Sequence, residues 1–446
     1  MPENRTNNTI QAFWIGLGSL CSFGFSLVSA AIISRYLTKD EYGTYRQILY
    51  VYNTLLVVFT LGLPRAYSYF LPRVDISEGQ AIIRKLNICF LFLGVIFSAI
   101  LYCGADLIAD ILKNPGLSEP MRIFSPTPIF LLPTMGLEGV LATYKRTQLN
   151  AIYTVITRFI SVLFIVIPVI YYKSTCNIAV GGFTTSAVFT CLIGLIIMRY
   201  PFRGIVKKHS SVGLKEILMF SVPLMFAGIG GIAEKAADQF YISRWFGEVV
   251  FADFANGSME LPFVGMVLSA GAVVLLPLFS KLSLGEGNKE EIISLWRRSA
   301  IKAAYILYPL VVFSWFFATP IMTFLYGEQY EDSGIYFKIM LVINIFTIAQ
   351  YYPILLALGK TRLYSTVLIL SAIVVWGIEY ISVSIFNNSY LVSVVSVAVR
   401  IGKILFFLSV ISKVLRCSIK KLFPFGDLGR ILFSSVVSCA ITLLFL

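Results

Sequence analysis

Residues 86–104 read LNICFLFLGVIFSAILYCG, a run without one charged side chain. A membrane-spanning helix needs about 20 consecutive apolar residues, whereas a tilted barrel strand needs only about half as many. Further uncharged runs of spanning length lie at 6–34, 178–198, 261–280, 303–325 and 339–358. The length of these runs predicts helices that cross a bilayer.

The overall composition also indicates a membrane protein. Hydrophobic residues make up 58% of the chain and charged residues 13%, with a mean hydropathy of +0.83. Soluble domains carry roughly 25% charged residues. We expect about twelve spanning helices, at 10–34, 47–70, 86–105, 123–143, 149–172, 177–198, 217–243, 254–280, 303–325, 339–358, 363–386 and 390–412. A last apolar run, 431–446, is short for a full crossing and leaves the count between 12 and 14.

Lysine and arginine are concentrated in the loops that follow the even-numbered spans, including Arg203, Lys207, Lys208, Arg297 and Arg298. Basic residues in short loops stay on the cytoplasmic side of a membrane. We therefore expect a multi-pass protein with a cytoplasmic N-terminus. The net charge of +13 follows from this asymmetry and suits anionic membrane lipids, so nucleic acid is not expected as a partner.

Short motifs occur twice, once in each half of the chain. Residues 34–37 (SRYL) and 42–45 (YGTY) have counterparts at 243–246 (SRWF) and 251–254 (FADF), and residues 142–145 are echoed at 357–360. Near-equal spacing of this kind is typical of transporters built from two parallel repeats with the substrate path between them. It predicts two parallel six-helix lobes, 1–205 and 206–415, followed by a tail, 416–446, that holds a possible extra helix.

Sequence signatures of catalysis and cofactor binding fail on inspection. Gly359-Lys360-Thr361 is similar to the end of a phosphate-binding loop, but Ile354 stands where that loop needs a glycine. The single histidine, His209, has no neighbouring partner, and the seven cysteines contain no C-x-x-C pair. We expect no catalytic residue, no cofactor, no metal site and no enzymatic activity.

Charged side chains inside the spans are the main functional signal, because charge within a bilayer is unfavourable. The spans contain Arg65, Arg158, Lys235, Arg400, Lys403, Glu138, Glu234, Asp238, Glu260 and Glu379. Glu234 and Asp238 share one face of the span 217–243, with Lys235 beside it. Such a face should line an aqueous cavity or pack against another helix. Ser396, Arg400 and Lys403 are similarly aligned on the span 390–412.

Plainer explanations stay open for several of these residues. Long side chains near span ends reach the interface and anchor a helix, as Arg35, Arg65, Arg158, Lys403 and Glu260 are placed to do. Glu379 and Arg400, on adjacent spans, suit a structural ion pair. Anchoring and transport are therefore alternative interpretations of these charges.

Residues 33–46, ISRYLTKDEYGTYR, resemble the signature of Wzx-type polysaccharide flippases. These flippases belong to the multidrug, oligosaccharidyl-lipid and polysaccharide exporter (MOP) superfamily. Residues 220–224 (FSVPL), the region of Asp238 and residues 275–280 (LLPLFS) are also similar to that family. The resemblance spans most of the chain.

The resemblance implies an all-α, V-shaped, two-lobed transporter of the bacterial inner membrane. It would move undecaprenyl-diphosphate-linked oligosaccharide repeat units by alternating access, for O-antigen or capsular polysaccharide. In that setting Arg35, Arg65, Lys235 and Arg400 are the candidates for the diphosphate or its approach. Coupling to protons or sodium would use Glu234, Asp238 or Glu260. Contacts with a polysaccharide polymerase and a chain-length regulator are further expectations.

Three other functions remain as alternatives. A peptidoglycan lipid-precursor flippase is a relative, although its basic residues would be concentrated in the N-terminal lobe. A cation-coupled drug exporter of the same superfamily often carries an acidic residue in its first helix, and residues 6–34 have none. A membrane polysaccharide polymerase or ligase generally needs a large periplasmic loop, which the short segment 105–122 does not supply.

Overall fold

The computed structural model describes residues 8–172, 175–206, 208–210, 212–283, 289–348 and 351–444. Within these ranges the chain is helical, with no β-strand. Eleven candidate membrane spans lie among the described residues: Phe13–Tyr36, Lys39–Arg73, Ile76–Cys103, Thr147–Tyr171, Cys176–Phe202, Leu214–Gly257, Lys289–Phe316, Ser333–Ala357, Thr361–Phe386, Ser389–Leu415 and Phe425–Leu443. The expectation of an all-α polytopic membrane protein is confirmed.

The contacts divide the chain into two compact units. Unit 1 comprises 1–232 and 243–252, and unit 2 comprises 233–242 and 253–446. The long helix α11, Leu214–Gly257, supplies residues to both units and is interrupted at Gly247, where φ is 80°. The two transporter lobes expected at 1–205 and 206–415 remain a prediction. The two units are defined by contacts alone, and such units do not show how a transporter divides into lobes.

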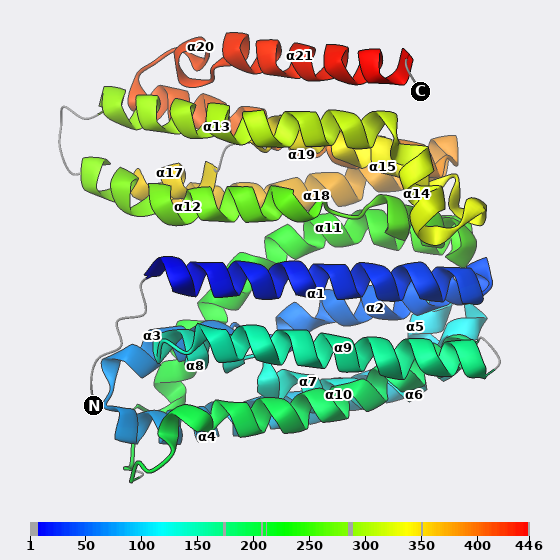
Figure 1. Cartoon of the computed structure of the whole chain (residues 1–446), viewed down its shortest axis with the longest axis vertical. Coiled ribbons are helices and arrows are strands. Elements are labelled where there is room, and N and C mark those ends of the chain that lie inside the picture. The colour runs from blue at the N-terminus through cyan, green and yellow to red at the C-terminus, as the bar shows by residue number, and fades with distance from the viewer. Residues whose placement is uncertain are drawn as a thin grey trace. The chain divides into compact units, whose positions relative to one another are not determined.

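Unit 1 begins with the helices α1 (Asn8–Tyr36), α2 (Lys39–Thr60), α3 (Pro64–Phe70), α4 (Ile76–Cys103) and α5 (Ala105–Leu112). It continues with α6 (Ser118–Phe124), α7 (Thr127–Leu131), α8 (Leu137–Thr143), α9 (Thr147–Tyr171) and α10 (Cys176–Met198). Helix α9 packs along both α1 and α10, as Figure 1 shows. The stacked rings of Tyr52, Phe59 and Phe97 bury part of the interior between α2 and α4.

The motif at 42–45 lies in α2, where the helix meets the 243–252 segment of unit 1. A Cβ atom at Gly43 would lie only 2.0 Å from the carbonyl oxygen of Glu248, so this position requires glycine. Nearby, the Gln47 amide donates to Ser243 at 2.8 Å. The duplicated sequence motif is therefore a packing site in unit 1.

The segment 123–143 does not form the single continuous helix expected there. The chain there forms α6, α7, the 3₁₀ turn η3 (Leu132–Thr134) and α8. Pro126, Pro128 and Pro133 each lack the backbone N–H that a continuous helix needs, and their rings clash with the preceding turn. The break leaves short helical pieces packed against α4 and α10.

Unit 2 contains α12 (Pro262–Ser283), α13 (Lys289–Phe316), α14 (Ala318–Tyr326), α15 (Ser333–Leu341) and α16 (Ile343–Phe346). It ends with α17 (Tyr351–Ala357), α18 (Thr361–Phe386), α19 (Ser389–Leu415), α20 (Ile419–Leu422) and α21 (Phe425–Leu444). Trp296, Tyr330, Tyr336 and Phe337 are fully buried in this unit. Helices α18 and α19 lie side by side, and α13 lies along α21 (Figure 1).

Helix α21 begins earlier than the apolar run 431–446 suggested. Its first turn starts at Phe425 and includes Asp427, which forms an ion pair with Arg297 on α13 at 3.6 Å. The segment Phe425–Leu443 is long enough to cross a membrane. A search for uncharged apolar runs starts this helix too late, because charged residues lie in its first turns.

Candidate functional site

A cluster of charged side chains lies inside unit 2, where α11 meets α18 and α19. Glu234 of α11 is 3% exposed. Lys403 of α19 donates to it, with Nζ 2.6 Å from Oε1, and Ser371 of α18 donates to Oε2 at 3.0 Å. The Nε atom of Arg400 lies 3.7 Å from the same Oε1 atom. Glu234 is thus held by two cations and one hydroxyl group.

Asp238 lies one helical turn further along α11 and is 2% exposed. Arg400 donates from Nη2 to Oδ2 at 3.0 Å. Ser396 lies 2.9 Å from Oδ1 and 2.8 Å from Oδ2 through its hydroxyl oxygen. The spacing of Ser396, Arg400 and Lys403 puts all three on one face of α19, as the sequence predicts. We call Glu234, Asp238, Arg400 and Lys403 the ion cluster.

The ion cluster balances its charges, with two carboxylates facing two cations. Buried ions lose most of their hydration, so they are tolerated only when close partners and hydrogen bonds replace the water. Removing one member would leave an opposite charge without compensation. The face of α11 that carries Glu234 and Asp238 therefore packs against other helices of unit 2, one of the two arrangements expected from the sequence.

Glu379 of α18 differs from the ion cluster. Its side chain is 0% exposed, and no hydrogen-bond donor among the described residues reaches either carboxyl oxygen. The carboxyl group of Asp238 lies next to it. The expected ion pair between Glu379 and Arg400 is wrong for the described structure, because Arg400 pairs with Asp238 and Glu234 instead. The hydroxyl groups of Ser382, one turn along α18, and of Ser393, one turn from Ser396 on α19, are also buried without a hydrogen-bond partner among the described residues.

Lys235 and Glu260 form a separate, exposed ion pair in unit 2. The Lys235 Nζ atom lies 2.5 Å from Glu260 Oε1, and the two side chains are 61% and 76% exposed. The Lys235 ammonium group lowers the pKa of the Glu260 carboxyl below its usual value. Both residues line a cavity of about 460 Å³ together with Asp238 and Arg400.

A smaller cavity of unit 2, about 260 Å³, adjoins the cations of α19. Arg400 and Lys403 line it together with Tyr351, Tyr352 and Tyr364. The rings of Tyr352 and Tyr364 lie 5.1 Å apart, and that of Tyr364 stacks on Phe407 at 5.3 Å. The cations of the ion cluster therefore face an aromatic wall on one side.

Unit 1 contains a cavity of about 420 Å³ with a different lining, which we call the arginine cavity. Its basic residues are Arg46 of α2 and Arg158 of α9, and its described lining contains no carboxylate. Its other residues with a polar side-chain atom are Ser26, Ser29, Tyr45, Tyr52, Asn53 and Ser161. A cavity with cations and hydroxyl groups but no acid is suited to an anionic, hydroxyl-rich ligand.

The remaining sequence candidates also lie in unit 1. Arg35 is exposed in the last turn of α1, and Arg65 is exposed in the first turn of α3. The structure thus groups Glu234, Asp238 and Arg400 in one cluster, adds Lys235 and Glu260 at a shared cavity, and leaves Arg35 and Arg65 on other elements.

Several residues of these sites were missed or assigned a plainer role. Lys403 and Arg158 were candidates for interface anchoring, and Arg46 was seen only as part of a motif. The alignment of Lys403 with Arg400 on one helical face was the available signal for its pairing with Glu234. Arg158 and Arg46 line one cavity because of how several helices pack together, which the spacing along one helix does not encode.

The comparisons with known proteins place the chain in a family. The model of the family described as "Polysaccharide biosynthesis protein" matches residues 32–335, more than half of the chain. The chain belongs to this family. The match includes both the motif at 42–45 and the α11 segment with Glu234 and Asp238.

A curated relative, the succinoglycan biosynthesis transport protein ExoT of Rhizobium meliloti (strain 1021), is 22% identical over 335 residues. The alignment covers 73% of this chain and 64% of that relative, so the chain spans less than two thirds of the relative's length.

Two solved structures share the fold. The lipid II flippase MurJ, in an inward closed conformation, has a TM-score of 0.69 at 14% identity, covering 98% of this chain and 93% of MurJ. An inward-facing multidrug resistance MATE family transporter of the MOP superfamily has a TM-score of 0.69 at 15% identity, covering 88% and 95%. The fold is that of MOP-superfamily transporters, as the resemblance of residues 33–46 implied.

Proposed function

We propose that this protein is a flippase for oligosaccharide repeat units carried on a polyprenyl diphosphate. The observation that carries the proposal is the arginine cavity of unit 1, in a membrane protein of a polysaccharide biosynthesis family. A diphosphate bearing several sugars does not cross hydrocarbon unaided, because its charges and hydroxyl groups lose their hydration. A transporter must therefore supply cations and hydrogen-bonding groups along the path.

Arg46 and Arg158 are the proposed contacts of the diphosphate in unit 1. Guanidinium groups form paired, charge-assisted hydrogen bonds with phosphate oxygens. Asn53 offers an amide to the hydroxyl groups of the sugars. The polyprenyl chain stays in the bilayer during this step, since lipid already solvates it.

The basic residues that the sequence suggests as phosphate ligands are less suited to this role than Arg46 and Arg158. Arg400 already pairs with two buried carboxylates, so its charge is largely compensated within the protein. Lys235 is exposed and paired with Glu260, so it remains a proposed secondary contact that exchanges one anion for another. Arg35 and Arg65 remain proposed contacts during approach, because both are exposed near helix ends.

Ion coupling is proposed at the carboxyl groups of unit 2. Glu234 and Asp238 already have cationic partners, and Glu260 pairs with Lys235. Glu379 is buried beside Asp238 without such a partner, so we place a coupling proton or sodium ion at Glu379. A bound cation would supply the charge that the described donors do not supply. Buried hydroxyl groups of Ser382 and Ser393 offer further oxygen ligands.

The cellular setting follows from the same proposal. The protein would act in the bacterial inner membrane with its N-terminus in the cytoplasm, delivering repeat units for O-antigen, capsule or a related polysaccharide. The polysaccharide polymerase and the chain-length regulator would then be its partners in the membrane. The charge of the loops and the family match support this setting.

Complementation and a transport assay test the proposal. The gene should restore surface polysaccharide in a host that lacks its own flippase. Purified protein in proteoliposomes should move a labelled undecaprenyl-diphosphate-linked oligosaccharide to the opposite leaflet, scored by its access to an impermeant lectin. An Arg146→Ala variant is a suitable control, because Arg146 is exposed in unit 1 outside the arginine cavity. Rescue of drug resistance alone, with no transport of the glycan lipid, would contradict the proposal.

Two alternative substrates are tested by the same assay. The fold is shared with a lipid II flippase and a multidrug transporter, which makes a peptidoglycan precursor and a cationic drug the competing ligands. The absence of a carboxylate from the described lining of the arginine cavity disfavours a cationic drug there. A preference for the peptidoglycan precursor over oligosaccharide repeat units would assign the first alternative.

A further inference from the structure

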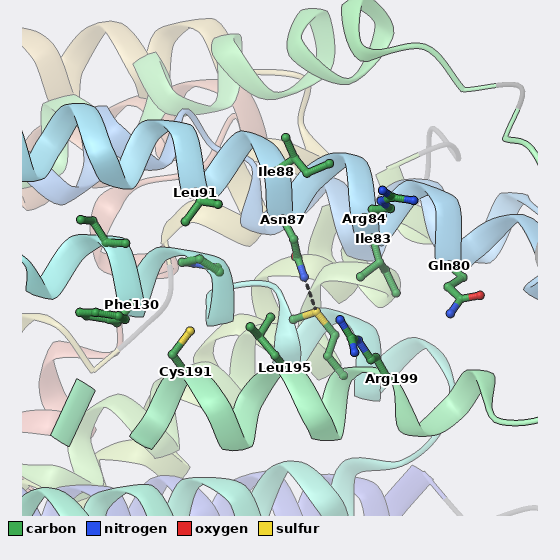
Figure 2. A pocket seen from close by; sticks show the side chains of 13 residues that line it. Gln80, Ile83, Arg84, Asn87, Ile88, Leu91, Phe130, Cys191, Leu195 and Arg199 are labelled. Atoms are coloured by element: carbon green, nitrogen blue, oxygen red, sulfur yellow. Dashed lines mark hydrogen bonds between the residues drawn. The ribbon is translucent and has the colours of Figure 1, made fainter. Parts of the chain in front are cut away.

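A groove of about 700 Å³ lies on unit 1 between α4, the α7–η3 segment and α10. Figure 2 shows Arg84 and Arg199 at one end of this groove and Phe130 and Cys191 toward the other. Its volume lies within the range of about 300 to 1,000 Å³ that is common for small-molecule sites. The groove shares no described lining residue with the arginine cavity.

The proline-broken segment creates this groove. Ile129, Phe130 and Pro133 line one side, in the region where the expected continuous helix ends as α7 and η3. A straight helix would present side chains along its whole length to α4 and α10. The short pieces leave an apolar channel instead, which Leu91 and Leu195 continue on the two flanking helices.

The two arginines, Arg84 and Arg199, line the same end of the groove (Figure 2). Arg84 lies about two turns after the start of α4, and Arg199 directly follows the last residue of α10. Both are exposed, and both adjoin the segments that the loop charges predict to be cytoplasmic. No ion pair among the described residues involves either arginine. Two guanidinium groups at one end of the groove are therefore available to an anion.

A fixed polar group lies between the arginines and the apolar channel. The Asn87 side chain accepts from the Tyr67 hydroxyl at 2.6 Å and donates to the Met198 sulfur at 3.2 Å, the contact dashed in Figure 2. Beyond it, Ile88 and Leu91 are 56% and 47% exposed, so the channel opens toward the bilayer. The order along the groove is thus cationic, polar and then apolar.

We propose that this groove binds an anionic phospholipid of the bilayer. The phosphate would lie between Arg84 and Arg199, and one acyl chain would follow Leu91, Phe130 and Leu195. Basic pockets between membrane helices on the cytoplasmic side are known to select anionic headgroups. A singly charged anionic lipid offsets one of the two guanidinium charges, whereas a zwitterionic lipid has no net charge and brings a further cation beside them. Because a lipid seated here contacts α4, the η3 segment and α10 together, its binding stabilises the broken 123–143 region.

The test measures binding of dioleoyl phosphatidylglycerol to the delipidated full-length protein by native mass spectrometry and by the shift of its melting temperature. We expect binding and an upward shift with phosphatidylglycerol, and much weaker effects with phosphatidylcholine of the same chains. The double variant Arg84→Gln, Arg199→Gln should bind at least about tenfold more weakly, while Arg146→Gln should bind normally.

A second variant distinguishes the contribution of the lipid's acyl chain from that of its headgroup. Leu195→Trp narrows the apolar channel and leaves both arginines in place, so it should also weaken binding. Equal binding of the two phospholipids would overturn the proposal, as would displacement by millimolar inorganic phosphate, which would indicate a site for a free anion. Preferential binding of undecaprenyl phosphate at this groove would overturn the choice of a phospholipid and assign the groove to the carrier.

Discussion

The two units use arginine in opposite ways. In unit 2, Arg400 and Lys403 are held by Glu234 and Asp238, and the charges of the ion cluster cancel inside the protein. In unit 1, Arg158 lines a cavity whose described lining contains no acid. The first arrangement is internally complete, whereas the second leaves positive charge facing a cavity. The difference teaches that counting charges within spans does not locate a ligand; the location also depends on which side chains line each cavity.

The comparison assigns different tasks to the units. The arginine cavity is the proposed place for the diphosphate, and the carboxyl groups around Glu379 are the proposed place for a coupling ion. Variants of the ion cluster should then affect stability, a variant at Glu379 should affect coupling, and variants in the arginine cavity should affect ligand binding without affecting stability.

The largest stability effect is expected for Glu234→Ala. This change leaves Lys403 buried without its carboxylate, and breaking a buried pair in this way typically costs about 3 to 5 kcal/mol. The melting temperature of the purified protein and its abundance in membranes should both fall. The double variant Glu234→Ala, Lys403→Ala removes the orphaned charge and should recover part of the loss. Unchanged melting of the single variant would show that the ion cluster does not support the fold.

Gly43→Ala should produce the next largest loss of stability, because Gly43 is a tightly packed position of unit 1. The added Cβ atom would meet the carbonyl oxygen of Glu248 at 2.0 Å, so α2 and the 243–252 segment must move apart. We expect a loss of about 1 to 3 kcal/mol in unfolding free energy, as for other overpacked interiors. Gly24→Ala is a matched control, because a Cβ atom there meets nothing within 4 Å. Equal melting temperatures for the two variants would contradict this reading of the duplicated motif.

Glu379→Gln tests whether transport is coupled to an ion bound at Glu379. The amide preserves size but does not bind a proton or a sodium ion as a carboxylate does. Transport by the original protein should rise several-fold under an imposed proton or sodium gradient, and transport by the variant should be the same with and without it. Indifference of the original protein to both gradients would remove coupling from the proposal.

The smallest effect is expected for Lys235→Ala. Exposed ion pairs contribute at most about 1 kcal/mol, so abundance and melting should remain near normal. Transport should fall by about twofold if Lys235 is a secondary phosphate contact. A loss as large as that caused by changing the arginine cavity would move the main phosphate site to unit 2.

The sequence predicted the membrane class and one face of α11 well, because each depends on local order along the chain. Glu234 and Asp238 are both buried, as their shared helical face indicated, and the resemblance of residues 33–46 agrees with the polysaccharide biosynthesis family whose model matches the chain. Contacts between helices were harder to predict. Pairing of Arg400 with Asp238 instead of Glu379 depends on how α11, α18 and α19 pack, which no single-helix pattern contains.

The missed breaks have a similar origin. Hydropathy treats 123–143 as one apolar run, although its prolines divide it into short helices. Hydropathy also placed the start of α21 at Ile431. Asp427 and Arg430 interrupt the apolar run, although both residues are part of the helix. The length of an apolar run thus predicts that a segment enters the membrane. Where the helix breaks, begins and ends depends on its prolines and on the charged residues near its ends.

The central claim is that positive charge in the arginine cavity, and not in the ion cluster, holds the diphosphate. It is tested most directly by equilibrium binding of a fluorescent undecaprenyl-diphosphate-linked oligosaccharide to protein in nanodiscs. Each charged hydrogen bond is worth about 1.5 to 3 kcal/mol, so Arg46→Ala, Arg158→Ala should weaken binding at least about a hundredfold with normal melting. Binding by this variant that matches the original protein would contradict the claim.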